Sequence, residues 1–182
     1  MDEEWKSMIF EGMTIILLVV ILGYALIRQI LKKQGNATIV WSQHIPWTSQ
    51  KNRDNQLVFS TIIPIKNDTG IDFTLIDVFP RLQLPEEQYK EGIWRAWCRR
   101  VDTKRQDGYW EAAILPRKTE NAIEIFLVLD SLKTVDTAMM NLPDFSIDLY
   151  WLIVCRNPQR VEWQRLTVAA EKLREAWQRG EK

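Results

Sequence analysis

The sequence predicts one membrane-spanning helix, an all-β antiparallel sandwich of the immunoglobulin-like class, and a C-terminal amphipathic α-helix. Three observations predict this arrangement: a long uncharged run near the N-terminus, about seven segments in which apolar residues alternate, and an apolar spacing of three and four residues near the C-terminus. We expect a short acidic tail at 1–7, the transmembrane helix at 8–31, the sandwich at 36–156 and the C-terminal helix at 158–179.

The N-terminal run carries no charge between Glu11 and Arg28, a stretch of 16 residues inside a longer apolar segment. About 20 helical residues cross the hydrocarbon core of a bilayer, so this segment is long enough to span it. A cleaved signal peptide would have a basic tip and a shorter apolar core, whereas this tip is acidic, which favours a retained single-pass anchor. Side chains within and flanking the helix are expected at the membrane interface: Trp5, Glu11, Arg28, Trp41 and Trp47.

Basic residues are more frequent after the apolar run than before it. Lys6 precedes the run, whereas Arg28, Lys32 and Lys33 follow its uncharged core. Because the more basic flank of a membrane helix usually stays in the cytoplasm, we expect a single-pass protein of a plasma or inner membrane whose C-terminal domain is cytoplasmic.

Alternating apolar residues predict the strands of the sandwich. The clearest alternation lies at 57–65, 121–130 and 145–155, where each segment has one continuous apolar face. Further strands are expected at 38–41, 93–101 and 109–115, with loops at 48–56 and 131–144, the second of which contains one helical turn.

Asparagine, glycine and proline residues indicate where turns and sheet edges are expected. Asn67 to Gly70 predicts a turn, and a phase change near Leu75–Asp77 in the segment that follows indicates a β-bulge. Pro80 cannot donate a hydrogen bond to a neighbouring strand, which places the short segment after it at a sheet edge.

One segment combines arginine with tryptophan. The turn at 106–108 predicts a hairpin between 93–101 and 109–115, which would bring Trp110 near the arginine-rich strand. Arginine beside tryptophan is typical of protein contact surfaces, and it also suits lipid headgroups or nucleic acid. The plainer interpretation is that the arginines are solvated or paired with acids across the hairpin. The predicted partner-contact face consists of Trp94, Arg95, Trp97, Arg99, Arg100 and Trp110.

The C-terminal segment has its own apolar seam. Asn157 and Pro158 are a favourable N-cap and first residue for a helix. Two heptads are too short to be stable alone, so the seam is expected to pack either on this chain's sandwich or on a partner helix. The seam residues are Trp163, Leu166, Ala170, Leu173 and Trp177.

The composition argues against several function classes. Lysine and arginine number 24 and aspartate and glutamate 24, so the net charge is zero and no nucleic acid partner is expected. With one histidine, His44, and two cysteines, Cys98 and Cys155, there is little material for a metal site or a nucleophile–base pair. No phosphate-binding, dinucleotide-binding or nucleophile-elbow motif is present. We therefore expect no catalytic residue, metal or cofactor, and reduced cysteines.

These surfaces suggest a function without a reaction. The prediction is a non-catalytic, membrane-anchored protein-interaction module, an accessory, scaffold or assembly subunit of a larger membrane complex. Its expected partners are the lipid bilayer and one or more proteins of that complex, and a small-molecule ligand is not expected. The alternative is a membrane-anchored domain that binds a ligand or lipid as a sensor.

Overall fold

The structure, a computed structural model, describes residues 2–32, 37–42, 45–53, 55–84, 89–103, 107–155 and 159–180. The chain forms two compact units, Met1–Gln34 and Gly35–Lys182. The first unit is the helix α1 (Asp2–Lys32). Within α1, the 22 residues Met8–Gln29 have a mean hydropathy of 2.3 and are not buried, so this helix is long and apolar enough to cross a membrane.

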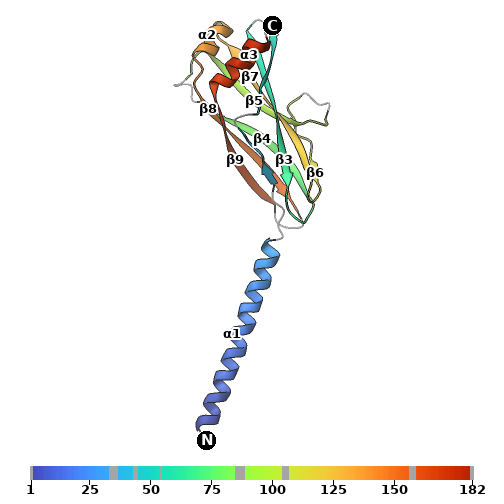
Figure 1. Cartoon of the computed structure of the whole chain (residues 1–182), viewed down its shortest axis with the longest axis vertical. Helices are drawn as coiled ribbons and strands as arrows, with labels where there is room; N and C mark the ends of the chain where they lie inside the picture. The colour runs from blue at the N-terminus through green and yellow to red at the C-terminus, as the bar shows by residue number, and fades with distance from the viewer. Residues whose placement is uncertain are drawn as a thin grey trace. The chain divides into compact units, whose positions relative to one another are not determined.

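The second unit is built of two antiparallel sheets and two short helices (Figure 1). One sheet has the order β1-β3-β7-β5, and β2 also pairs with β3; its strands are β1 (Ala37–Ile39), β2 (Thr48–Arg53), β3 (Gln56–Asn67), β5 (Gly92–Arg100) and β7 (Glu120–Ser131). The other sheet has the order β6-β4-β8-β9; its strands are β4 (Phe73–Gln83), β6 (Ala113–Leu115), β8 (Phe145–Val154) and β9 (Arg160–Val168). The helices α2 (Val135–Met140) and α3 (Ala170–Gly180) lie together at one end of this unit (Figure 1).

One hydrophobic core joins the two sheets. Alternation along each strand turns every second side chain inward, and these inner side chains are almost completely buried. Those with no exposed area include Phe59, Ile63, Ile123, Ile125, Leu127, Leu129, Ile147, Leu149, Ile153 and Leu166. The strands that we predicted at 57–65, 121–130 and 145–155 are therefore confirmed as β3, β7 and β8.

Two predicted local features are also confirmed. The register of β4 against β8 skips one residue between Leu75 and Asp77, which is the expected bulge. In the turn after β3, the Asn67 side-chain oxygen accepts hydrogen bonds from the Thr69 backbone N–H (3.0 Å) and the Thr69 hydroxyl (2.6 Å). This is the Asx-type turn chemistry that asparagine favours.

The predicted hairpin between 93–101 and 109–115 is wrong. β5 pairs with β7, and the short β6 pairs with β4 in the other sheet. A turn is nevertheless present, since Gly108 has a positive φ of 75°, which glycine adopts without strain. The chain uses this connection to cross between sheets rather than to pair neighbouring strands.

Two further expectations change in the structure. The segment 48–53, expected in a loop, is the edge strand β2, which pairs with β3 on one side. β4 continues through Pro80 to Gln83 without a break, and Pro80 pairs with Leu149 of β8. β6 pairs only with Phe73–Leu75 of β4, so the side of β4 that faces away from β8 has no paired strand at Pro80. A proline is tolerated there because its missing N–H removes no hydrogen bond between strands on that side.

The predicted helix at 158–179 is wrong over its first half. Residues 160–168 form strand β9, which pairs with β8, and only 170–180 are helical; the expected cap at Asn157 and Pro158 lies outside the described residues. Val161, Trp163 and Thr167 favour strands, and they also sit at alternating positions. The spacing of three and four residues between Trp163 and Trp177 is a coincidence, because β9 is followed directly by α3 and the residues do not lie on one continuous helix.

The helix α3 is fixed at both ends by contacts with other elements. The Asp144 carboxylate accepts a hydrogen bond from the backbone N–H of Ala170 at 2.8 Å, as an N-cap would. The Ser49 hydroxyl of β2 donates to the Ala176 carbonyl oxygen at 2.9 Å. At Gly180 a side chain would meet Ser49, because a Cβ there would lie 2.4 Å from its Oγ. The helix therefore lies directly against the edge strand β2.

Candidate functional site

Three aromatic rings form a row across the outer side of the four-stranded sheet. Phe79 of β4 lies opposite Tyr150 of β8, which lies opposite Trp163 of β9. The Phe79 and Tyr150 rings stack with centroids 5.2 Å apart, and Tyr150 stacks on Trp163 at 6.2 Å. Phe79 and Trp163 are nevertheless 48% and 56% exposed. Large rings left exposed in one contiguous row are typical of contact surfaces.

Two further rows of residues flank these rings. On one side Asp77, Leu152 and Val161 lie opposite one another, and on the other side Arg81, Asp148 and Arg165 do. We name this surface the aromatic face; its nine residues are Asp77, Phe79, Arg81, Asp148, Tyr150, Leu152, Val161, Trp163 and Arg165.

An ion pair anchors the charged row. The Arg165 guanidinium donates two hydrogen bonds to the Asp148 carboxylate, at 2.8 and 3.0 Å, and its Cζ lies 5.8 Å from the centre of the Trp163 ring. The hydrogen bonds from Arg165 hold the pKa of the Asp148 carboxyl below its usual range, despite the opposing effect of its burial. A carboxyl with a lowered pKa stabilises the folded state above its unfolded pKa of about 4, and that contribution is lost as the pH falls through the folded pKa.

The predicted partner-contact face does not form one surface. Arg95, Trp97 and Arg99 share the outer side of β5, as their alternation predicts. Arg95 pairs with Asp130 and Arg99 with Glu124, both acids on β7 rather than across a hairpin. The Trp97 ring stacks on Phe126 of β7 with centroids 3.9 Å apart. These groups already have intramolecular partners.

The remaining members of that predicted face point elsewhere. Trp110 is buried and its indole N–H donates to the Leu75 carbonyl oxygen at 3.3 Å. Trp94 packs against the core, and Arg100 forms an ion pair with Asp102. Burial of Trp110 corrects the expectation that it contacts a partner, and Trp94 is partly buried against the core.

The predicted helical seam is divided between two elements. Trp163 and Leu166 belong to β9, whereas Ala170, Leu173 and Trp177 belong to α3. Leu166, Ala170 and Leu173 are at most 1% exposed and Trp177 packs against them, so these residues are part of this chain's own core. Trp163 alone faces outward.

The residues expected at the membrane interface fall into two groups. Trp5, Glu11 and Arg28 are exposed on α1. Trp47 is only 5% exposed and Trp41 packs against the core of the second unit. Trp47 is therefore a core residue, which corrects the expectation that it rests in lipid headgroups.

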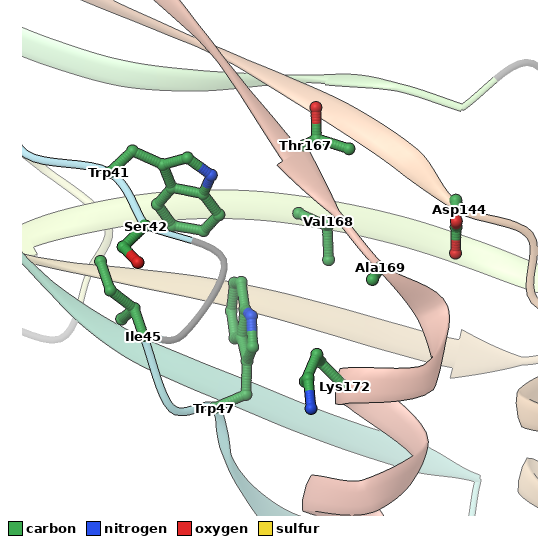
Figure 2. A pocket seen from close by; sticks show the side chains of 9 residues that line it. All are labelled: Trp41, Ser42, Ile45, Trp47, Asp144, Thr167, Val168, Ala169 and Lys172. Atoms are coloured by element: carbon green, nitrogen blue, oxygen red, sulfur yellow. The ribbon is translucent and has the colours of Figure 1, made fainter.

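A small cavity lies between the segment containing Trp41 and Trp47 and the junction of β9 with α3. Figure 2 shows the two indoles on one side and Val168, Ala169 and Lys172 on the other. The cavity measures about 220 Å³. The two charged side chains that line it already have partners: the Asp144 carboxylate accepts a hydrogen bond from the Ala170 backbone N–H, and the Lys172 ammonium group forms an ion pair with Glu175 at 3.0 Å. Cavities that hold small ligands are usually larger, about 300 Å³ or more.

A second cavity of about 180 Å³ lies beside Tyr89 and Trp94. Burial raises the pKa of Tyr89 to about 12, and its hydroxyl donates to the Ala138 carbonyl oxygen at 3.2 Å. Burial likewise raises the pKa of the Cys98 thiol, which donates to the Val78 carbonyl oxygen. Both groups are held neutral and hydrogen-bonded, so neither is prepared to act as a base or nucleophile.

No cluster of three or more metal-ligating side chains occurs within the described parts of the chain. The Asn67 side chain has a structural role, since its amide is buried and donates to the carbonyl oxygens of Ile71 (2.9 Å), Leu115 (3.0 Å) and Pro116 (3.0 Å). The single histidine, His44, lies outside the described residues.

Comparisons with known proteins give no family. No protein-family model matches the sequence, and no curated protein matches it. Among solved structures, a Bordetella pertussis protein provisionally assigned as ApaA is 11% identical with a TM-score of 0.42, and the match covers 75% of this chain and 95% of that one. The GAE domain of yeast GGA1 is 10% identical with a TM-score of 0.36, covering 71% of this chain and 96% of that one. A Bacillus subtilis protein, ycdA, provisionally described as a lipoprotein, is 12% identical with a TM-score of 0.40, covering 74% of this chain and 37% of that one. Similarities this distant carry no inference about what the chain binds.

Sequence reasoning missed the aromatic face because it assigned Trp163 to a helix. The available signal was a large aromatic residue at an outward-facing position of each of three strands: Phe79 beside inward Val78, Tyr150 between inward Leu149 and Trp151, and Trp163. Aromatic residues are favoured in strands wherever they point, so this signal does not by itself distinguish a contact surface.

Proposed function

We propose that this chain is a non-catalytic, membrane-anchored protein-interaction module that acts as an accessory, scaffold or assembly subunit of a larger membrane complex. The single observation that carries the proposal is the exposed row of Phe79, Tyr150 and Trp163 on the aromatic face. Exposing two large rings to water is unfavourable, and a partner that covers them would remove that cost.

The strand order supports an immunoglobulin-like sandwich as the scaffold of this module. In constant-type immunoglobulin domains, the first, second, fifth and fourth strands form one sheet, and the third, sixth and seventh form the other. The chain has this order if β1 and β2 are taken as a divided first strand and β6 as a short additional strand. The aromatic face then lies on the sheet of the third, sixth and seventh strands.

The anchor in this proposal is α1, with the second unit in the cytoplasm. Its support is the uncharged run of α1 and the bias of basic residues toward Arg28, Lys32 and Lys33. In sealed spheroplasts carrying a C-terminally tagged chain, added protease is expected to leave the tag intact until the membrane is permeabilised. Immediate removal of the tag would put the second unit outside, and release of the chain by alkaline washing would mean that α1 is no anchor.

The alternative function, a membrane-anchored ligand or lipid sensor, has less support. It would require a cavity of ligand size, about 300 Å³ or more, whereas the two cavities measure about 220 and 180 Å³. An interaction surface needs only exposed area, which the aromatic face has.

The experiment that tests the proposal compares two pairs of alanine substitutions in the tagged full chain. After cross-linking in membranes, Phe79→Ala with Trp163→Ala is expected to reduce the captured partner about tenfold or more, because aromatic residues dominate contact energies. Ile62→Ala with Ile93→Ala is the matched control, since these side chains are 51% and 57% exposed on the other sheet. Equal capture by both variants, with both folded, would contradict a role for the aromatic face.

A further inference from the structure

The charges on the aromatic face are arranged with opposite signs on either side of the aromatic row. Along β4, Asp77, Phe79 and Arg81 all point outward, so an acid and a base flank the ring. Asp77 and Arg81 are both exposed, and neither forms an ion pair with another residue that the structure describes. The charge of Asp77 is thus exposed to a partner, whereas Arg81 faces solvent and also acts on Asp148, whose pKa it helps to lower.

The other charges on this face largely cancel. Asp148 is 4% exposed and is already bonded to Arg165, which leaves the row of Arg81, Asp148 and Arg165 with one net positive charge. The row of Asp77, Leu152 and Val161 carries one negative charge. The face is therefore neutral as a whole, with its negative end and its positive end separated by the three rings.

A neutral surface with this polarity is complementary to itself. We propose that a second copy of this chain covers the aromatic face, an inference that rests on the proposed function and names the partner. In such a pair the two faces meet about a two-fold axis that runs parallel to the aromatic row. Asp77 of each copy then lies opposite Arg81 of the other, and the aromatic rows lie on each other.

The competing two-fold arrangement is less favourable. An axis parallel to the strands would place Arg81 of one copy opposite Arg165 of the other, which brings like charges together. Only the first arrangement gives two opposite-charge contacts for each pair of chains. The charge pattern thus specifies both the partner and the relative direction of the strands, which is antiparallel.

The size of the surface indicates a weak pair that the membrane reinforces. The aromatic face spans three strands about 4.8 Å apart and runs from Asp77 to Arg81 along β4, so it offers on the order of 250 Å². A stable dimer usually buries about 800 Å² on each partner. Anchoring both copies in one bilayer raises their effective concentration, so pairing is expected in membranes more than in dilute detergent.

The test uses charge reversal in the full chain, reconstituted in vesicles at a fixed protein-to-lipid ratio and counted by single-molecule photobleaching. Asp77→Arg leaves two bases beside the rings, and Arg81→Asp leaves two acids, so each variant alone repels its own copy. We expect each to weaken pairing about tenfold or more relative to wild type. Mixed together in two colours, the two variants regain both opposite-charge contacts and should pair with each other. The exposed residue Ile62, on the other sheet, provides the matched control Ile62→Asp, which should pair as wild type does.

Each outcome decides the inference. Recovery of pairing in the mixture supports pairing through this face, because mixing two variants that are each defective alone would not restore binding to a different protein. Unchanged pairing in either single variant would overturn it, as would wild-type chains that remain single in vesicles. If such single chains still capture another protein through Phe79 and Trp163, the proposed function stands and only the identity of the partner is wrong. Arg81→Asp puts a second carboxylate beside Asp148 and can lower the melting temperature of the chain. If the Arg81→Asp variant melts earlier than wild type, Arg81→Gln is used in its place. A mixture of Arg81→Gln with Asp77→Arg is then expected to regain one of the two opposite-charge contacts.

Discussion

Aspartate in place of Leu166 or Leu173 is expected to unfold the second unit, whereas aspartate in place of Trp163 is expected to leave it folded. Leu166 and Leu173 have no exposed area, while Trp163 is 56% exposed. Burying an unpaired carboxyl group costs several kcal/mol even after it takes up a proton, and the leucine packing is lost as well, which together is a large part of a domain's total stability of about 5–15 kcal/mol. Thermal unfolding of the full chain in detergent, followed by far-ultraviolet circular dichroism, measures the difference.

A milder substitution gives a graded result for the same site. Leu166→Ala should lower the free energy of unfolding by about 3 kcal/mol, because it removes buried methyl groups and leaves a cavity. Trp163→Ala should change it by about 1 kcal/mol or less, since one side of the ring already faces water. If the two aspartate variants at Leu166 and Leu173 melted as wild type does, the core assignment would be wrong and these residues would be a free docking seam.

Asn67→Asp is expected to cause the second large loss, about 3 kcal/mol, although the two side chains have nearly the same shape. The Asn67 amide donates to three backbone carbonyl oxygens while its oxygen accepts from Thr69. An aspartate puts an oxygen where the donor was, opposite those three carbonyl groups in a site with no exposed area. Chemical denaturation of the detergent-solubilised chain measures this loss.

The matched control is Asn55→Asp, the same chemical change at an exposed turn residue between β2 and β3. It should alter the free energy of unfolding by less than about 0.5 kcal/mol. Equal losses at both positions would mean that added negative charge, and not the missing donor at Asn67, destabilises the chain.

Patterns confined to one element were predictable from the sequence. Burial of alternate residues in β3, β7 and β8 follows from period-two alternation, and the bulge at Leu75–Asp77 follows from its change of phase. The helix α1 follows from length and hydropathy alone. In each case the signal lies within one continuous stretch of the chain, and the longest of these is the 22-residue apolar run of α1.

Features that depend on distant residues were not predictable in this way. β5 and β6 are neighbours in sequence, yet β5 pairs with β7 and β6 with β4, because strands pair according to how both sheets close around one core. The identity of β9 depends on hydrogen bonds to β8, which outweigh the helical spacing of its apolar residues.

The candidate site shows the same division. The outward direction of Arg95, Trp97 and Arg99 was predictable from alternation, but their acidic partners on β7 were not. The aromatic face combines residues from positions 77 to 165 and exists only once β4, β8 and β9 lie side by side.

The contact of α3 with β2 has a consequence for the edge of the five-stranded sheet. β2 is an edge strand, and an unpaired edge can recruit a strand from another molecule. The helix lies against β2 through Ser49 and Gly180, where even a single added carbon would collide. The last helix thus packs directly on the edge strand, and a side chain at position 180 is expected to push the end of α3 away from β2.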